Sequence, residues 1–166
     1  MDTKELLDYW QVGTRIFHMA HHRASAFYAR MQKAVGMSVV ILTTAAGTTI
    51  ISQLEATSMT GQVIVGLLSM AATVLAALQT FLNLEGRAEQ HRAAALKYGM
   101  LRRRIELVLV DAGIEEAKLA AFMESFRTDW DLADKEAPIL PQRFYDKAKL
   151  IVTQSIEAAR KRREKH

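Results

Sequence analysis

Histidine is the residue type with the most chemical potential in this sequence. His18 and His22 are one helical turn apart, so a helix would place both on one face. If a second long helix folds back antiparallel to the first, His91 falls within about one turn of His22. Three imidazoles could bind zinc or copper, or could titrate near neutral pH. The favoured interpretation is a structural one, in which His91 forms a hydrogen bond where the long helices pack, with Tyr98 or Tyr28 as its partner.

No catalytic arrangement accompanies these histidines. His21 and His22 are expected on a solvated face. With the structural interpretation favoured for His91, the sequence predicts no metal site. The motifs GxxxxGK[ST], GxGxxG, GxSxG and HExxH are all missing. There is no Cys, which excludes disulfides and thiolate metal sites. We therefore predict a protein that is not an enzyme and needs no cofactor. If a nucleotide controls it, the sensor is expected in a separate chain.

Hydroxyl side chains form a second polar set, inside two otherwise apolar segments. Their spacing of about one helical turn places them on one face of each segment. The positions are Thr44, Thr48 and Ser52 in the first segment and Ser69, Thr73 and Thr80 in the second. Such residues let membrane helices pack closely and hydrogen-bond. Alternatively they line a water-filled pore, which needs a homo-oligomer because two helices cannot enclose a channel. The residues alone favour packing, and the more polar first segment is the better candidate for a pore wall.

The two segments, residues 34–54 and 62–84, are long enough to cross a membrane. Between Lys33 and Glu85 there is no Lys or Arg, and the only acid is Glu55. A bilayer core about 30 Å thick needs roughly 20 apolar residues in a helix. We predict two transmembrane helices. The alternative is a soluble bundle with an apolar central hairpin, which is less favoured because a soluble amphipathic helix would carry charges on its wet face.

The flanking charges predict the orientation. Basic residues lie beyond the outer ends of both segments, and the connecting loop has none. The positive-inside rule then places both termini, residues 1–33 and 85–166, in the cytoplasm of a multi-pass inner-membrane protein. In an antiparallel pair, Arg30 and Lys33 reach the height of Glu85 and Glu89. We expect weak ion pairs there, at the membrane surface.

The apolar spacing predicts an all-α, single-domain fold over residues 1–166. One helix is expected from about residue 3 to 53, with no stop signal before the membrane. A second begins after Thr60 and Gly61 and continues unbroken to a stop at residues 111–113. Two shorter helices follow, at about 114–135 and from residue 142, separated by Pro138 and Pro141. The result is a transmembrane hairpin of two long antiparallel helices, extending into a cytoplasmic helical bundle.

The second segment and its exit resemble the SLATT family, in the run LSMAATVLAALQTFLNLEGRAEQHRAAALKYGMLRRRIE and the later EAPILP. The matching positions are residues 80–83, Ala88, His91, Ala94, Tyr98, residues 102–106 and residues 137–141. SLATT proteins are two-span membrane proteins of prokaryotic conflict systems, often encoded beside nucleotide-second-messenger synthases or nucleotide sensors. The resemblance implies a pore-forming effector that arrests or kills an infected cell when such a regulatory partner triggers it.

Three function classes follow. The first is an oligomeric membrane effector that permeabilises the inner membrane in an antiphage, abortive-infection response. The second is a non-conducting membrane anchor or scaffold that recruits cytoplasmic partners, and the third is a soluble helical oligomer. The basic end ARKRREKH is expected to be a solvated helix terminus, with lipid headgroups as an alternative partner. Nucleic-acid binding is not expected.

Overall fold

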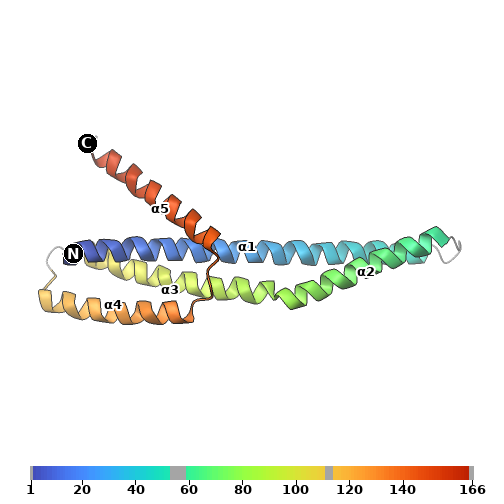
Figure 1. Ribbon diagram of the computed structural model, residues 1–166, viewed down its shortest axis with the longest axis horizontal. Coiled ribbons are helices and arrows are strands. Elements are labelled where there is room, and N and C mark those ends of the chain that lie inside the picture. The colour runs from blue at the N-terminus through green and yellow to red at the C-terminus, as the bar shows by residue number, and fades with distance from the viewer. Residues whose placement is uncertain (1, 53–58, 111–113, 165–166) are drawn as a thin grey trace. The chain divides into compact units, whose positions relative to one another are not determined.

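The computed structural model describes residues 2–52, 59–110 and 114–164 of the chain (Figure 1). Helices account for 93% of it, and these residues contain no strand. The all-helical prediction is confirmed. The helices are α1 (Thr3–Ser52), α2 (Met59–Leu82), α3 (Leu84–Val110), α4 (Glu116–Glu136) and α5 (Gln142–Arg163).

Most of the predicted helix bounds agree with these. Helix α1 starts where Asp2 accepts a hydrogen bond from the Thr3 amide at 2.6 Å, and Glu5 accepts one from the Asp2 amide at 3.1 Å. This reciprocal arrangement satisfies amides that a helix start leaves without partners. Helix α2 already includes Thr60 and Gly61, which were expected to precede it. The connection at residues 53–58 and the predicted stop at 111–113 lie outside the described residues.

The prediction of an unbroken second long helix is wrong, because the helix is interrupted at Asn83. Helix α2 ends at Leu82 and α3 begins at Leu84. Between them Asn83 has a φ of 43°, in the left-handed region. An L-residue there cannot continue a right-handed helix, and Asn adopts this conformation more readily than most residues.

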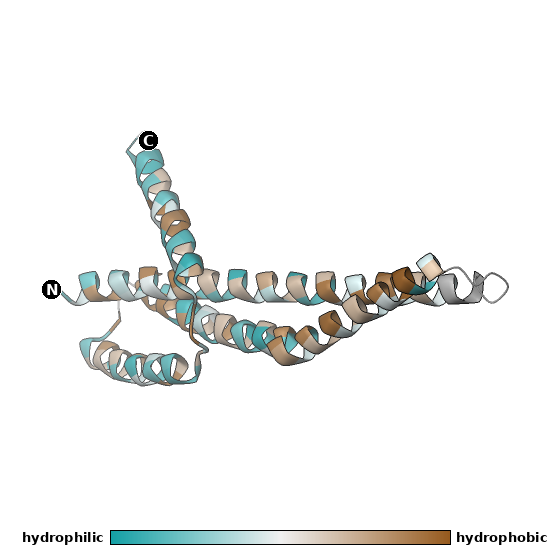
Figure 2. Cartoon of the chain, turned by 45° about the vertical axis from the view of Figure 1, so that its right-hand side comes forward, coloured by the Kyte–Doolittle hydropathy of each residue, from teal (hydrophilic) through white to brown (hydrophobic). Residues whose placement is uncertain are grey.

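The chain forms two compact units, Met1–Ala26 with Ala88–His166, and Phe27–Arg87. We call the first the bundle unit and the second the two-helix unit. Helix α1 contributes to both. The hydrophobic colour in Figure 2 runs along α2, in the two-helix unit, while α5 is mostly hydrophilic.

The bundle unit has a core built by α1, α3 and α4. Its buried residues are Leu7, Ala94, Tyr98, Leu101, Ile105, Phe126 and Ala133. Trp10 stacks on Phe126 with ring centroids 5.2 Å apart. Trp130 packs against Gly13, where an added Cβ would come within 2.8 Å of the indole ring. Close packing of α4 on α1 therefore depends on that glycine.

A second cluster joins α5 to α1. Ala148 and Val152 of α5 are buried against Ile16 and Ala20 of α1. Phe144 is also buried, so the apolar side expected for this helix is confirmed up to residue 152, while Ile156 is exposed. Pro141 precedes α5 in an extended conformation, as the two prolines predict.

Candidate membrane-spanning helices and a buried histidine pair

Helix α2 presents its large apolar side chains outward. Among the described residues, one helical stretch is long and apolar enough to cross a membrane. It is α2 together with α3, Met59–Val110, and only 11% of its most apolar window is buried. The core helix of a soluble protein would be mostly buried. The exposed residues of α2 are Met59, Val63, Ile64, Leu67, Met70, Val74, Leu78 and Phe81. At 3.6 residues per turn most of them share one side of the helix.

Small and hydroxyl-bearing residues occupy the other side of α2. Together with α1 they line a groove within the two-helix unit, and its lining residues are Val39, Thr43, Ala46, Gly47, Ser69, Ala72, Thr73 and Ala76. Ala46 and Ala72 are buried, 6% and 5% exposed. Small residues of this kind let two helices approach closely.

The predicted hydroxyl faces therefore have different surroundings in the two helices. In α2, Ser69 and Thr73 line the groove toward α1. In α1, Thr43 lines it, a residue that the spacing argument missed. Thr44 and Thr48 are exposed and are not part of that lining. The side chain of Ser52 lies outside the described residues.

Hydroxyl groups on both helices donate to their own backbone. Thr48 Oγ1 bonds to the Thr44 carbonyl at 3.0 Å, and Thr73 Oγ1 bonds to the Ser69 carbonyl at 2.8 Å. Thr80 Oγ1 donates to the Ala76 carbonyl at 3.2 Å. Such bonds to the preceding turn satisfy the donor without a partner on a neighbouring helix.

Polar residues gather at one end of the two-helix unit, in a groove that Gln32, Gln79, Thr80, Asn83 and Glu85 help to line. This groove was not predicted. The sequence analysis looked for oppositely charged residues at this height, whereas Gln32, Gln79 and Asn83 carry uncharged amide side chains. Arg30, Lys33 and Glu85 are exposed. Glu89, in the bundle unit, pairs with Arg92 of the same helix at 3.8 Å, and both side chains are largely exposed. Within the described residues of the two-helix unit, no ion pair joins Arg30 or Lys33 to Glu85.

A buried histidine pair links α1 and α3 in the bundle unit. His21 Nδ1 lies 2.9 Å from His91 Nδ1. Their side chains are 1% and 3% exposed. The His21 ring also stacks on Tyr98 at 5.4 Å between centroids. His91 thus has the structural hydrogen bond that we predicted, but its partner is His21, and the expectation that His21 is solvated was wrong.

Burial disfavours a charge on His21. Desolvation first, and the charge of His91 second, lower the pKa of His21 from 6.5 to about 4. At neutral pH His21 is therefore uncharged.

The other histidines do not complete a metal site. His18 Nδ1 lies 2.8 Å from the Ala95 carbonyl oxygen, which can only accept, so this nitrogen carries the hydrogen. His22 is exposed, and its ring centroid is 6.4 Å from that of His18. No group of three or more His, Asp or Glu side chains within the described ranges could hold a metal ion.

Tyr98 extends the buried polar contacts toward α4. Its hydroxyl donates to Asp134 at 2.5 Å, and Trp130 Nε1 donates to the same carboxylate at 3.1 Å. Burial is the main reason that the pKa of Tyr98 is raised above its usual range, and the hydrogen bond to Asp134 adds to it. The phenol therefore stays a neutral donor.

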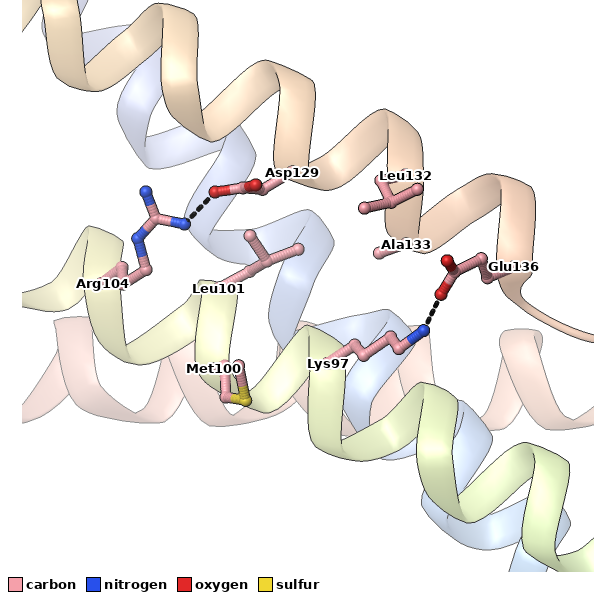
Figure 3. Close-up of a pocket in the computed structure, with 8 residues that line it drawn as sticks. All are labelled: Lys97, Met100, Leu101, Arg104, Asp129, Leu132, Ala133 and Glu136. Carbon is pink, nitrogen blue, oxygen red and sulfur yellow. Dashed lines mark hydrogen bonds and ion pairs between the residues drawn. The ribbon is translucent and has the colours of Figure 1, made fainter.

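Two ion pairs, Lys97–Glu136 and Arg104–Asp129, also join α3 to α4 (Figure 3). Leu101 and Ala133 lie between the two pairs, in the same pocket. All four charged side chains are partly exposed, so each pair contributes at most about 1 kcal/mol.

The helical architecture and the exposed apolar face of α2 define a membrane-type, all-α protein. The chain belongs to the SMODS and SLOG-associating 2TM effector domain family 4, SLATT_4, whose family model matches residues 13–132. The predicted resemblance is thereby confirmed. The family is one of two-transmembrane effector domains and is not a known enzyme family. No curated protein and no solved structure matches the chain.

Proposed function

We propose that this protein is an oligomeric effector that permeabilises the inner membrane. The observation that carries the proposal is the exposed apolar side of α2, in a stretch without Lys or Arg from residue 34 to 84. Burying that side in lipid removes large apolar side chains from water. Residues 34–54 of α1 and residues 62–84 then form the transmembrane hairpin. The flanking basic residues favour cytoplasmic termini.

A pore requires several copies, because one helix pair encloses no channel. Thr44 and Thr48 are exposed on the single chain and lie outside the groove with α2. They are therefore available to face water at the centre of an oligomer. The hydroxyls of α2 at Ser69 and Thr73 face the groove, which favours helix packing for them. These contacts support α1 as the pore wall.

The trigger is proposed to come from a separate chain. The description of the family names association with SMODS and SLOG. A nucleotide-second-messenger synthase or a nucleotide sensor is the partner we infer. The described part of this chain offers no metal cluster that would suggest a catalytic role of its own.

Leakage from dye-loaded liposomes tests the proposal. Purified protein with its genomic partner and trigger should release the dye. The double variant Thr44→Val and Thr48→Val removes two hydroxyls with little change in volume and should reduce leakage several-fold. The matched double variant Thr73→Val and Thr80→Val makes the same chemical change in α2 and should leak like the wild type.

A non-conducting anchor is the second candidate, and the self-bonded hydroxyls favour it. Because Thr48, Thr73 and Thr80 donate to their own helix, none of their hydroxyl groups needs a water-filled pore to satisfy its donor. Absence of leakage with partner and trigger present would support the anchor and overturn the pore. Recovery of the protein without detergent in a high-speed supernatant would remove both membrane functions.

A further inference from the structure

Asn83 is the one residue other than glycine with a positive φ in the part of the chain that the structure describes. It lies two residues before Glu85, the first charged residue after the apolar stretch. Neither Pro nor Gly is present at positions 82–84, so no covalent feature forces the helix to stop there.

The side chain of Asn83 stabilises the break. Its Oδ1 accepts a hydrogen bond from the Gly86 amide at 3.2 Å, as an N-cap residue does. Its carbonyl accepts the first backbone bond of the new helix, from the Arg87 amide at 3.0 Å. The left-handed backbone is unfavourable for Asn, and this cap offsets that cost.

Gly86 makes the cap possible. A Cβ built at this position would lie 2.6 Å from Asn83 Nδ2 and 2.7 Å from Asn83 Oδ1. Any larger residue would displace the capping side chain. Asn83 is exposed and borders the groove near Gln79 and Thr80, so its side chain has room to leave the cap.

We propose that Asn83 and Gly86 form a conformational hinge, in which the capped break exchanges with an uninterrupted helix running from α2 into α3. The cap stabilises the break, and the left-handed backbone of Asn83 opposes it, so these two local effects act in opposite directions. A partner or lipid that binds one form better would shift the population toward it. The hinge does not depend on pore formation, and its test measures helix geometry.

Spin labels on Val74→Cys and Arg92→Cys report the two forms. Both residues are exposed, and the chain has no native Cys. In an uninterrupted helix, positions 18 residues apart lie on the same face about 27 Å apart. A broken helix gives a shorter distance. In nanodiscs the wild-type chain should show the shorter component by pulsed electron resonance.

Asn83→Ala removes both the cap and the preference for positive φ. It should raise the ratio of the component at about 27 Å to the shorter one roughly fivefold or more. Gly86→Ala should shift the ratio in the same direction. Gly66→Ala is the matched control, because no atom lies within 4 Å of its added Cβ, and it should leave the ratio unchanged.

Two results would overturn the hinge. One is a wild-type distribution with only the component at about 27 Å. The other is a shorter component that persists unchanged in both Asn83→Ala and Gly86→Ala, which would mean that packing imposes the break. Circular dichroism of each variant checks that it is folded. If Asn83→Ala does not fold, Gly86→Ala still tests the hinge.

Discussion

His21 and His91 share a single hydrogen between two Nδ1 atoms 2.9 Å apart in the interior of the bundle unit. One ring donates and the other accepts, so the contact holds only while at least one Nδ1 is unprotonated. If both rings were charged, two N–H groups would face each other in a buried site. The contact between α1 and α3 is therefore linked to pH.

We predict that acid destabilises the bundle unit between about pH 6.5 and 4. The pKa of His21 is about 4 in the folded protein and 6.5 when unperturbed. Below pH 6.5 the unfolded chain binds a proton that the folded chain does not, so stability falls as pH falls. The contribution of His21 to the free energy of unfolding is fully present above pH 6.5. Between pH 6.5 and 4 the free energy of unfolding falls by about 3 kcal/mol. Thermal unfolding in detergent across this range measures it.

Substitution separates this pair from other titrating groups. His21→Asn should flatten the pH dependence between pH 6.5 and 4, because the group with the lowered pKa is gone. His22→Asn, on the exposed neighbour, should retain the wild-type slope. Equal slopes in the wild type and His21→Asn would contradict the assignment.

Loss of the Tyr98 hydroxyl should destabilise the same unit. Tyr98→Phe deletes a hydrogen bond of 2.5 Å to the Asp134 carboxylate, and bonds to charged groups contribute about 1.5–3 kcal/mol. Because Asp134 reaches solvent, we expect a loss near the lower end, about 1–2 kcal/mol. Tyr9→Phe, at a 69% exposed position, is the control and should change the melting temperature little.

Gly13→Ala should loosen the packing of α4 on α1. The new methyl group would lie 2.8 Å from Trp130 Cη2, and the indole is held by its bond to Asp134. Overpacking of this kind costs about 1–3 kcal/mol. Chemical denaturation followed by Trp fluorescence measures the loss. If the midpoint stayed at the wild-type value, the indole would have to move at little cost.

In the two-helix unit, Ala72→Leu should separate α1 from α2. Ala72 is 5% exposed and lies in the groove beside Ala46, so the longer side chain of Leu would extend toward α1. Ala71→Leu makes the same change on an exposed position of α2 and serves as its control. Crosslinking between cysteines at Gly36 and Gln79, which lie close together across the pair, should fall sharply only in Ala72→Leu.

Helical periodicity was sufficient to predict most of the fold. Phe126 of α4 and Val152 of α5 are buried, each on the apolar side of its helix. The end of α4 and the start of α5 followed from Pro138 and Pro141, which restrict the backbone wherever they occur. These are local effects, and they do not depend on how the helices meet.

The missed features depend on contacts between helices or on a small local balance. His21 and His22 differ by one residue, and only the position at which α3 meets α1 decides which of them is buried. Thr43 was missed in favour of Thr44 for the same reason. The break at Asn83 gave only a weak sequence signal, because a single Asn or Gly is tolerated inside a helix. The capping bond between Asn83 and the Gly86 amide becomes visible only in the structure.

The two apolar clusters of the bundle unit have no residue in common, although both use α1. Helix α5 lies entirely beyond the residues 13–132 that match the family. Its attachment therefore rests mainly on its own cluster: a mutation at Ala148 or Val152 would release α5 and its basic last turn. The aromatic cluster around Phe126 would then lose the contact between Phe17 and Tyr145, whose ring centroids are 5.7 Å apart.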